Sequence, residues 1–213
     1  MPDLSFSIEN VAPVARAATP QLGFSVRVTN SQPDSVQSIA LSVQVQIEPV
    51  RRRYTAEEQE HLRDLFGEPE RWSQTLHPLL WSNVNLTVPG FTGSTLVEVP
   101  VPCTFDFNVA MTKYVYGLEA GELPTTLLFS GTMFYHGPVA LQIAKVPWDR
   151  EASYRVPVRA WKEMMDFYYP NHAWIALRRD VFERLCEYKS RYGIASWEQT
   201  LERMLGLTAE VKS

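Results

Sequence analysis

Residues 39–48 carry the most regular pattern in this chain, a strict alternation of apolar and polar side chains. The apolar positions are Ile39, Leu41, Val43, Val45 and Ile47, and the residues between them are small or polar. Successive side chains of a β-strand point to opposite faces of its sheet, so one face of this strand is apolar. A slip of one residue would move every apolar side chain into water. The pattern therefore predicts a strand of fixed register that covers a core on one side.

The same two-residue period recurs through the first two-thirds of the chain. Turn-forming residues, for example at 30–35 and 89–93, separate the periodic segments. Closely spaced strands with turns between them favour an antiparallel sandwich or barrel over βαβ units. The stretch from Cys103 to Pro147 is expected to form the spine of this structure, with three long strands. The eight predicted strands cover residues 4–9, 24–29, 39–48, 79–88, 94–101, 104–116, 125–135 and 139–147.

Helix signals interrupt this series once and dominate after Trp148. One helix is predicted near 55–67, where Thr55 and Glu58 form a capping box and Gly67 a C-terminal cap. A last short strand is expected at 154–157. Apolar residues at helical spacing and further caps then predict about three C-terminal helices, over 157–168, 180–193 and 196–205.

Together these patterns predict a mainly β (α+β) fold. Residues 1–150 are expected to form an antiparallel β-sandwich with the inserted helix, and residues 151–213 a helical segment packed on it, in a single compact unit. The 213 residues are 45% hydrophobic, which is sufficient for a substantial core.

Charge and segment composition narrow the function classes. The net charge is −4 and the isoelectric point about 5.6, which argues against bulk binding to nucleic acid or to an anionic membrane. Neither a signal peptide nor an apolar run of membrane-spanning length is visible in the sequence, so we expect a cytoplasmic protein without a membrane span. In that compartment Cys103 and Cys186 are expected to be reduced and buried.

No catalytic, cofactor or metal site is predicted. The four histidines show no metal-ligand spacing, neither cysteine has a Cys-x2-Cys partner, and the ten glycines build no phosphate-binding loop. Ser130 lacks the Gly-x-Ser-x-Gly setting of a hydrolase nucleophile. An enzyme is therefore the less favoured class.

The basic run Arg51-Arg52-Arg53 is the strongest candidate for a binding surface. It lies close in sequence to three aromatic residues, so the predicted partner-binding site comprises Arg51, Arg52, Arg53, Tyr54, Trp72 and Trp81. Arginine beside aromatic rings suits an acidic partner with guanidinium–aromatic stacking. The alternative is that these arginines pair with Glu57, Glu58 and neighbouring carboxylates at the surface. The helical tail is dense in aromatics, which are either core or, where exposed, a second interaction surface.

Several motifs, taken together, resemble an uncharacterised bacterial family known as a domain of unknown function and numbered 6084. They include Leu65-Phe-Gly-Glu-Pro-Glu-Arg-Trp72, Pro102-Cys-Thr-Phe-Asp106, Leu128-Phe-Ser-Gly-Thr132 and Val146-Pro-Trp148, and the similarity runs nearly the whole length. The family carries no assigned site. Its members are often encoded near nickel–iron hydrogenase operons, so the resemblance implies an accessory or assembly role.

Two hypotheses follow. The first is a non-enzymatic cytosolic protein-binding or assembly factor that uses a sheet edge or the aromatic tail, and exposed edges also allow homo-oligomers. The second is an enzyme or small-ligand-binding protein with a cleft between the sandwich and the C-terminal helices. A pocket lined by Asp106, Lys113 or His136 would favour the second hypothesis.

Overall fold

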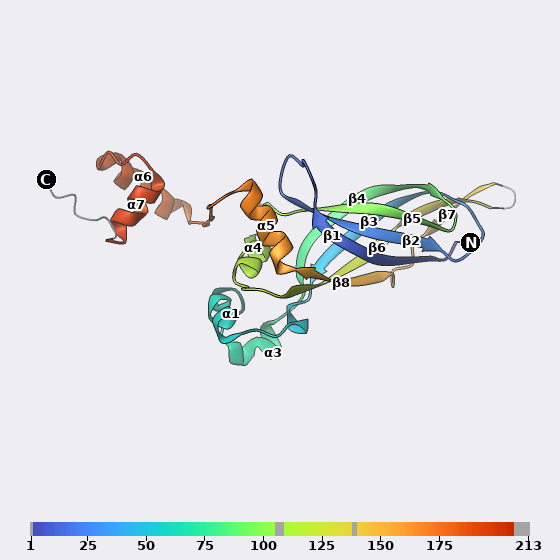
Figure 1. Ribbon diagram of the computed structural model, residues 1–213, viewed down its shortest axis with the longest axis horizontal. Helices are drawn as coiled ribbons and strands as arrows, with labels where there is room; N and C mark the ends of the chain where they lie inside the picture. Colours follow the sequence, from blue (N-terminus) through green and yellow to red (C-terminus); the bar gives the residue numbers. More distant parts are fainter. Residues whose placement is uncertain (1, 105–108, 138–139, 207–213) are drawn as a thin grey trace. The chain divides into compact units, whose positions relative to one another are not determined.

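Two antiparallel β-sheets make up most of the computed structural model, which describes residues 2–104, 109–137 and 140–206. The smaller sheet has the strand order β1-β2-β5, and its strands span Leu4–Pro13, Gln21–Asn30 and Ser94–Pro102. The larger sheet has the order β4-β3-β6-β7, and β8 pairs with β6 as well. Its strands are Leu79–Phe91 (β4), Val36–Ile47 (β3), Glu122–His136 (β6), Leu141–Lys145 (β7) and Glu151–Pro157 (β8). The predicted mainly β sandwich is confirmed (Figure 1).

Strand β3 has the predicted alternation, and it lies in the interior of the larger sheet. Its five alternating apolar residues are all buried, and β3 pairs with β4 on one side and β6 on the other. Strand β6 pairs with β3 along its length, while its other edge is shared by β8 at residues 122–128 and β7 at 132–136. Both faces of β6 are buried at residues 123–127, as expected for a strand covered on both faces. From Ser130 onward only one face is buried, so the expectation for 125–135 holds for the first part of the strand alone.

Aromatic pairs join the two sheets across the core. Phe6 of β1 stacks on Phe129 of β6, with ring centroids 4.2 Å apart and planes at 10°. Phe24 of β2 meets Trp81 of β4 edge to face at 6.0 Å. A register shift between Ile8 and Asn10 marks a bulge in β1, which explains why the regular alternation stops near residue 9 although the strand continues.

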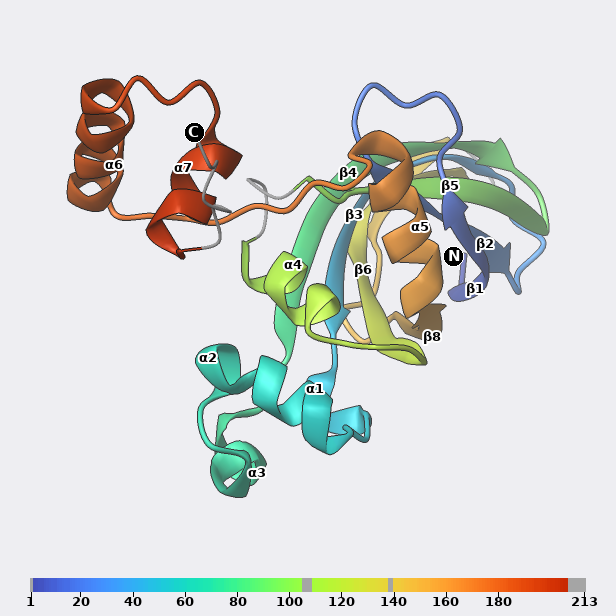
Figure 2. The ribbon, with the colours of Figure 1, turned by 60° about the vertical axis from the view of Figure 1, so that its left-hand side comes forward.

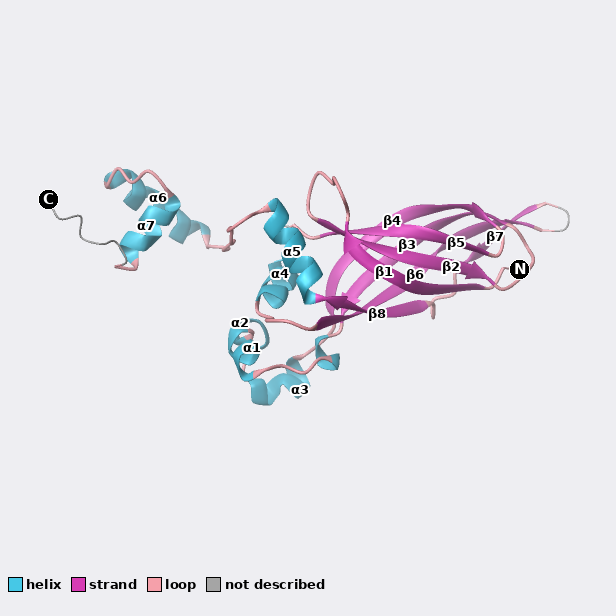
Figure 3. Ribbon diagram, in the orientation of Figure 1, coloured by secondary structure: helices cyan, strands magenta, loops and turns pink. Residues whose placement is uncertain are grey.

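The helices of residues 1–172 gather at one end of the sandwich (Figures 1 and 3). The connection from β3 to β4 holds two short 3-10 turns and three short helices, where one helix near 55–67 was expected. These are η1 (Pro49–Arg51), α1 (Ala56–His61), α2 (Arg63–Phe66), η2 (Pro69–Arg71) and α3 (Trp72–Thr75). The predicted capping box of Thr55 and Glu58 is present at the start of α1.

The predicted strand at 104–116 is wrong from Val109 onward. Residues Val109–Tyr116 form helix α4, and residues 105–108 lie outside the described part of the chain. The buried side chains of α4 are Met111, Thr112, Tyr114 and Val115, a helical spacing rather than an alternation. Helix α4 contacts β4 and α5 (Val158–Tyr168), and this tertiary packing decides the local structure. Figure 2 shows α4 beside β4.

The chain divides into two compact units, residues 1–172 and 173–213. Strand β8 and helix α5 belong to the first unit, although the sandwich was expected to end at residue 150. Within the second unit the structure describes α6 (Arg179–Arg191) and α7 (Trp197–Met204). The packing of this second unit on the sandwich stays a prediction.

Candidate functional site

The three consecutive arginines after β3 lie in different environments. Arg51 ends η1, and its side chain is exposed, as is that of Arg53. The Arg52 side chain is only 9% exposed. The predicted basic cluster is therefore divided, because two of its members face solvent and the third points into the protein.

Arg52 joins the β3–β4 connection to the start of β6. Its Nη2 donates to Glu58 Oε1 at 2.5 Å and to the Ala120 carbonyl at 2.7 Å. Its Nη1 donates to the Glu122 carbonyl at 2.8 Å. The Glu58 carboxylate is 3% exposed and accepts two backbone N–H groups as well, from Thr55 and Glu119. Pairing with Glu58, the alternative to partner binding, is thus observed for Arg52.

Tyr54 and Trp72 belong to an intramolecular aromatic cluster with Phe66 and Tyr114. Tyr54 meets Trp72 edge to face at 5.1 Å, and Phe66 contacts both Trp72 and Tyr114 at 5.8 Å. The Trp72 indole N–H donates to the Gly67 carbonyl at 2.9 Å. These contacts hold the short helices against α4.

Burial of this cluster also affects its hydroxyl groups. The Tyr54 and Tyr114 hydroxyls are 2.8 Å apart and hydrogen bonded, and Tyr54 donates to the Pro49 carbonyl as well. Removal from water raises the pKa of Tyr114 to about 12 and that of Tyr54 further. Both phenols are therefore neutral hydrogen-bonding groups at neutral pH.

Trp81 lies in the sandwich core, where it is 1% exposed against Phe24. Of the six predicted site residues, the structure brings Arg52, Tyr54 and Trp72 together as packing residues and leaves Arg51 and Arg53 at the surface. Their role toward a partner stays a prediction.

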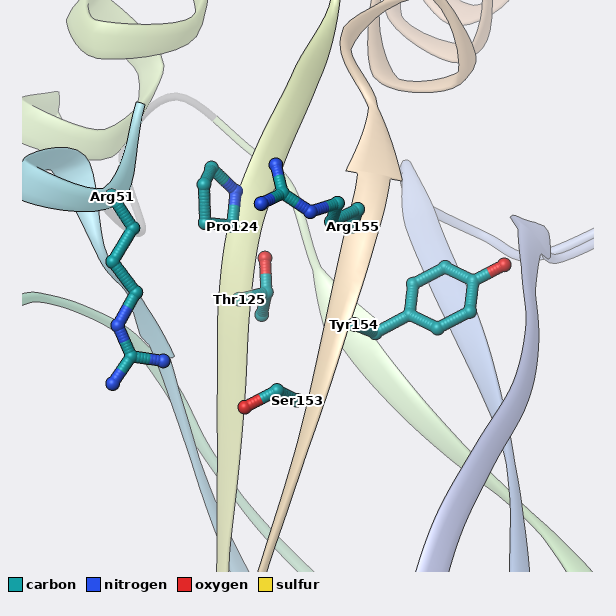
Figure 4. A pocket seen from close by; sticks show the side chains of 6 residues that line it. All are labelled: Arg51, Pro124, Thr125, Ser153, Tyr154 and Arg155. Atoms are coloured by element: carbon teal, nitrogen blue, oxygen red, sulfur yellow. The ribbon is translucent and has the colours of Figure 1, made fainter. Parts of the chain in front are cut away.

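Arg51 borders a hollow on the larger sheet, which we call the Arg51–Arg155 pocket (Figure 4). Its volume is about 400 Å³, and its lining residues are Arg51, Pro124, Thr125, Ser153, Tyr154 and Arg155. Nothing in the sequence linked Arg51 to Arg155. The only available signal was the short strand expected at 154–157, whose pairing partner could not be read from periodicity.

Of the residues proposed for a catalytic cleft, the two that the structure describes, Lys113 and His136, bond to other side chains. Asp106 lies outside the described residues. Lys113 Nζ pairs with Asp64 at 2.6 Å on the surface, and the His136 ring bonds to the Gln37 amide oxygen at 2.8 Å. A cleft of about 350 Å³ does lie between the β1–β2 loop and α5. Its lining is mainly apolar and consists of Pro13, Val14, Ala15, Arg16, Glu163, Met164, Phe167 and Tyr168.

The state of the two cysteines and the arrangement of possible metal ligands also bear on the chemistry of the protein. Both cysteines are free; Cys103 is buried, whereas Cys186 is partly exposed, contrary to the expectation that both are buried. Burial raises the pKa of the Cys103 thiol to about 12, so it is not a reactive thiolate. Among residues 2–104, 109–137 and 140–206, no cluster of three or more His, Cys, Asp or Glu side chains is arranged to hold a metal ion.

The aromatic tail is largely exposed in the second unit. Helix α6 has no buried residue, and α7 buries only Thr200. A groove of about 350 Å³ runs over these helices, lined by Ala173, Ile175, Leu177, Phe182, Leu185, Trp197, Glu198 and Leu201. We call it the α6–α7 groove. In the part of the chain that the structure describes, no helix has the length and apolar character needed to cross a membrane.

The solved structures that match this chain share little sequence with it. A CARDB domain from Pyrococcus furiosus, crystallised in complex with di-metal ions, is 14% identical, with a TM-score of 0.30 over 73% of this chain and 92% of that one. A protein assigned to the late embryogenesis abundant (LEA) class is 12% identical, with a TM-score of 0.35 over 74% and 72%. A β-glucosidase from Kluyveromyces marxianus is matched over only 15% of its length, at 10% identity and a TM-score of 0.29.

A search of curated proteins finds no match to this chain. One family profile covers the whole sequence, residues 1–213, and it is the family that the motifs resemble. The chain belongs to the family of unknown function DUF6084.

Proposed function

We propose that this protein is a non-enzymatic binding or assembly factor that docks on another protein through the α6–α7 groove. The observation that carries this proposal is the exposure of the second unit's apolar side chains. Eight large ones are 38–71% exposed: Ile175, Leu177, Phe182, Tyr192, Trp197, Leu201, Met204 and Leu205.

Such a surface is costly unless a partner covers it. Two short helices without a buried core are marginal in water, because helices in proteins derive most of their stability from packing of an apolar face. Contiguous exposed apolar surface marks interaction sites, and tryptophan is enriched among the residues that dominate binding energy. Phe182 and Trp197 meet at 5.6 Å inside the groove and supply two such anchors.

Local interactions keep the groove's helices in place for binding. Ser196 Oγ accepts the Gln199 N–H at the start of α7, which fixes the first turn. The helices are joined through Gly193, whose φ of +60° suits glycine. Lys189 lies over the Trp197 ring at 5.6 Å. A surface organised before binding loses less conformational entropy when a partner docks.

The family resemblance suggests where to look for the partner. We propose that this chain is a cytoplasmic bacterial protein and that its partner belongs to a nickel–iron hydrogenase system. We also propose that the sheet edges can pair into homo-oligomers, and the molecular mass in solution tests this.

Co-purification from the native host followed by reconstitution tests the proposal. A tagged full-length chain is expected to retain one protein in stoichiometric amount, and the purified pair is expected to bind in calorimetry. The double variant Phe182→Ala/Trp197→Ala should abolish binding. The control Glu187→Gln should leave binding intact, because Glu187 lies on α6 with Phe182 but does not line the groove. Binding that survives the double variant would contradict docking at this groove. A stoichiometric partner unrelated to hydrogenase would overturn only the hydrogenase assignment.

The cleft between the β1–β2 loop and α5 supports a second candidate function, the binding of a small apolar ligand. Its walls include Val14, Met164 and Phe167, and the Tyr168 hydroxyl fixes the loop by donating to the Ala17 carbonyl at 2.9 Å. Native mass spectrometry of the purified protein should then show a bound small molecule. The variant Ala15→Trp, which places a large side chain at an exposed position of the lining, should remove that molecule; a ligand-free protein would speak against this candidate.

A further inference from the structure

The Arg51–Arg155 pocket combines positive charge, hydroxyl groups and a hollow of about 400 Å³. Its two arginines come from distant segments, Arg51 from η1 and Arg155 from β8. Figure 4 shows Arg51 on one side of the β6 segment at Pro124 and Thr125, and Arg155 and Ser153 on the other, while the Tyr154 ring points away from them. The polar groups therefore lie along a short stretch of β6.

Pro124 ties both arginines to this stretch through the backbone. The Glu48 N–H donates to the Pro124 carbonyl at 2.8 Å, and the Arg51 N–H in turn donates to the Glu48 carbonyl at 3.0 Å. On the other side, Arg155 is the direct register partner of Pro124 in the β6–β8 ladder. The spacing of the two arginine Cα atoms is thus set by sheet pairing and by one 3-10 turn, not by a free loop.

The guanidinium groups retain capacity to bind a ligand. Among the described residues, the Arg51 side chain has no hydrogen bond or ion pair. Arg155 has one long ion pair, from its Nη1 to Glu122 Oε2 at 3.8 Å. The side chains of Arg155 and Glu122 are both at least half exposed. A single surface pair at that distance is weak and easily exchanged for a better acceptor.

The hydroxyl groups of the pocket add a further donor. Ser153 Oγ lies 3.4 Å from Thr126 Oγ1, a long contact that either hydroxyl could donate. The Thr125 hydroxyl is buried and donates to the Leu123 carbonyl at 3.1 Å. Ser153 can therefore turn its hydroxyl toward an acceptor in the pocket without breaking a strong hydrogen bond.

We propose that the Arg51–Arg155 pocket binds an oxyanion, a carboxylate or phosphate group held between the two guanidinium groups with Ser153 as an additional donor. Guanidinium offers a planar fork of N–H donors that matches both anions. The net charge of the whole protein is −4, so the two arginines make this pocket a locally positive site on an acidic protein. This site shares no lining residue with the α6–α7 groove and does not depend on the function proposed for that groove.

Titration of the full-length protein at constant ionic strength tests the site. The probes are inorganic phosphate, succinate and a glutamate-rich peptide, followed by calorimetry and by amide chemical shifts of residues 122–126 and 151–155. At least one probe is expected to saturate. Phosphate or succinate binding assigns the oxyanion to a free small molecule, and binding of the peptide alone assigns it to an acidic protein segment.

Three variants separate the pocket from general charge effects. Arg51→Gln and Arg155→Gln should each weaken binding by about tenfold or more, the loss of a charge-assisted contact. Arg53→Gln, which removes a neighbouring exposed arginine that does not line the pocket, should bind as the wild type does. Circular dichroism checks that each variant is folded. No saturable binding by any probe would overturn the proposal, as would equal weakening by all three variants.

Discussion

Breaking the Arg52–Glu58 pair provides the most direct test of how the helical end is joined to the sandwich. Replacing Arg52 with methionine keeps most of the apolar stem but leaves the Glu58 carboxylate buried without its cation. Removing one partner of a buried ion pair typically costs roughly 3–5 kcal/mol. Glu58 keeps two backbone N–H donors, from Thr55 and Glu119. We therefore expect a loss at the low end, about 3 kcal/mol in the free energy of unfolding.

A double-mutant cycle isolates the interaction. Glu58→Gln should cost about 2 kcal/mol, because Arg52 retains the carbonyls of Ala120 and Glu122. The double variant Arg52→Met/Glu58→Gln should cost less than the sum by at least about 1 kcal/mol, because no unpaired buried charge remains. Urea denaturation followed by tryptophan fluorescence measures each free energy.

Arg51→Met is the matched control, since Arg51 is adjacent in sequence and exposed. Its effect should lie within about 0.5 kcal/mol of zero. The reasoning is refuted if Arg52→Met costs no more than this control, or if the two single effects simply add. Either result would mean that water, not Arg52, satisfies the Glu58 carboxylate.

Three further predictions concern the sandwich and the aromatic cluster. Gly131→Ala should destabilise the fold by roughly 2 kcal/mol or more in thermal or urea unfolding, because φ is +145° and an added Cβ would lie 2.2 Å from the Ala40 carbonyl oxygen; an unchanged midpoint would disprove that close approach. Phe129→Ala should cost about 3–5 kcal/mol by the same measurement, since it empties the space against Phe6, and Phe129→Leu should cost clearly less. The pKa of Tyr114 is raised in the folded state to about 12, so its stabilising contribution is complete below about pH 10 and is lost as pH rises toward 12. Alkaline unfolding monitored by circular dichroism should therefore be shallower for Tyr114→Phe than for the wild type over that interval.

The periodic strands could be predicted because their physics is local. In β3 every second side chain faces the core, so alternation alone identifies the strand and its buried face. The capping box at Thr55 is equally local. Helix α4 could not be recognised in the same way, because its Tyr114 packs in an aromatic cluster whose other members lie some 40 to 60 residues earlier. Its short apolar run suits strand and helix equally until that packing is known.

For the candidate sites, too, the sequence predicted what is local and missed what depends on tertiary packing. Sequence proximity placed the three arginines together, but the chain turns at η1 and sends Arg52 inward while Arg51 stays outside. The partner of Arg51 in the pocket is Arg155, and these two residues come together because the β6–β8 ladder places Arg155 and the Glu48–Pro124 hydrogen bond places Arg51 at the same part of β6. Aromatic density in the tail was visible in the sequence, whereas its exposure depends on what packs against α6 and α7, which composition does not specify.

The shared edge of β6 also constrains how the protein can be synthesised. Residues 122–128 find their last neighbour only in residues 151–157, so a nascent chain that has emerged only to residue 150 presents an unsatisfied ladder of backbone groups there. Such an edge can pair with another growing chain on the same messenger RNA. Completion of the larger sheet therefore has to wait until residue 157 has emerged, and a translational pause after residues 122–128 have emerged but before that point would prolong the interval in which nascent chains can aggregate.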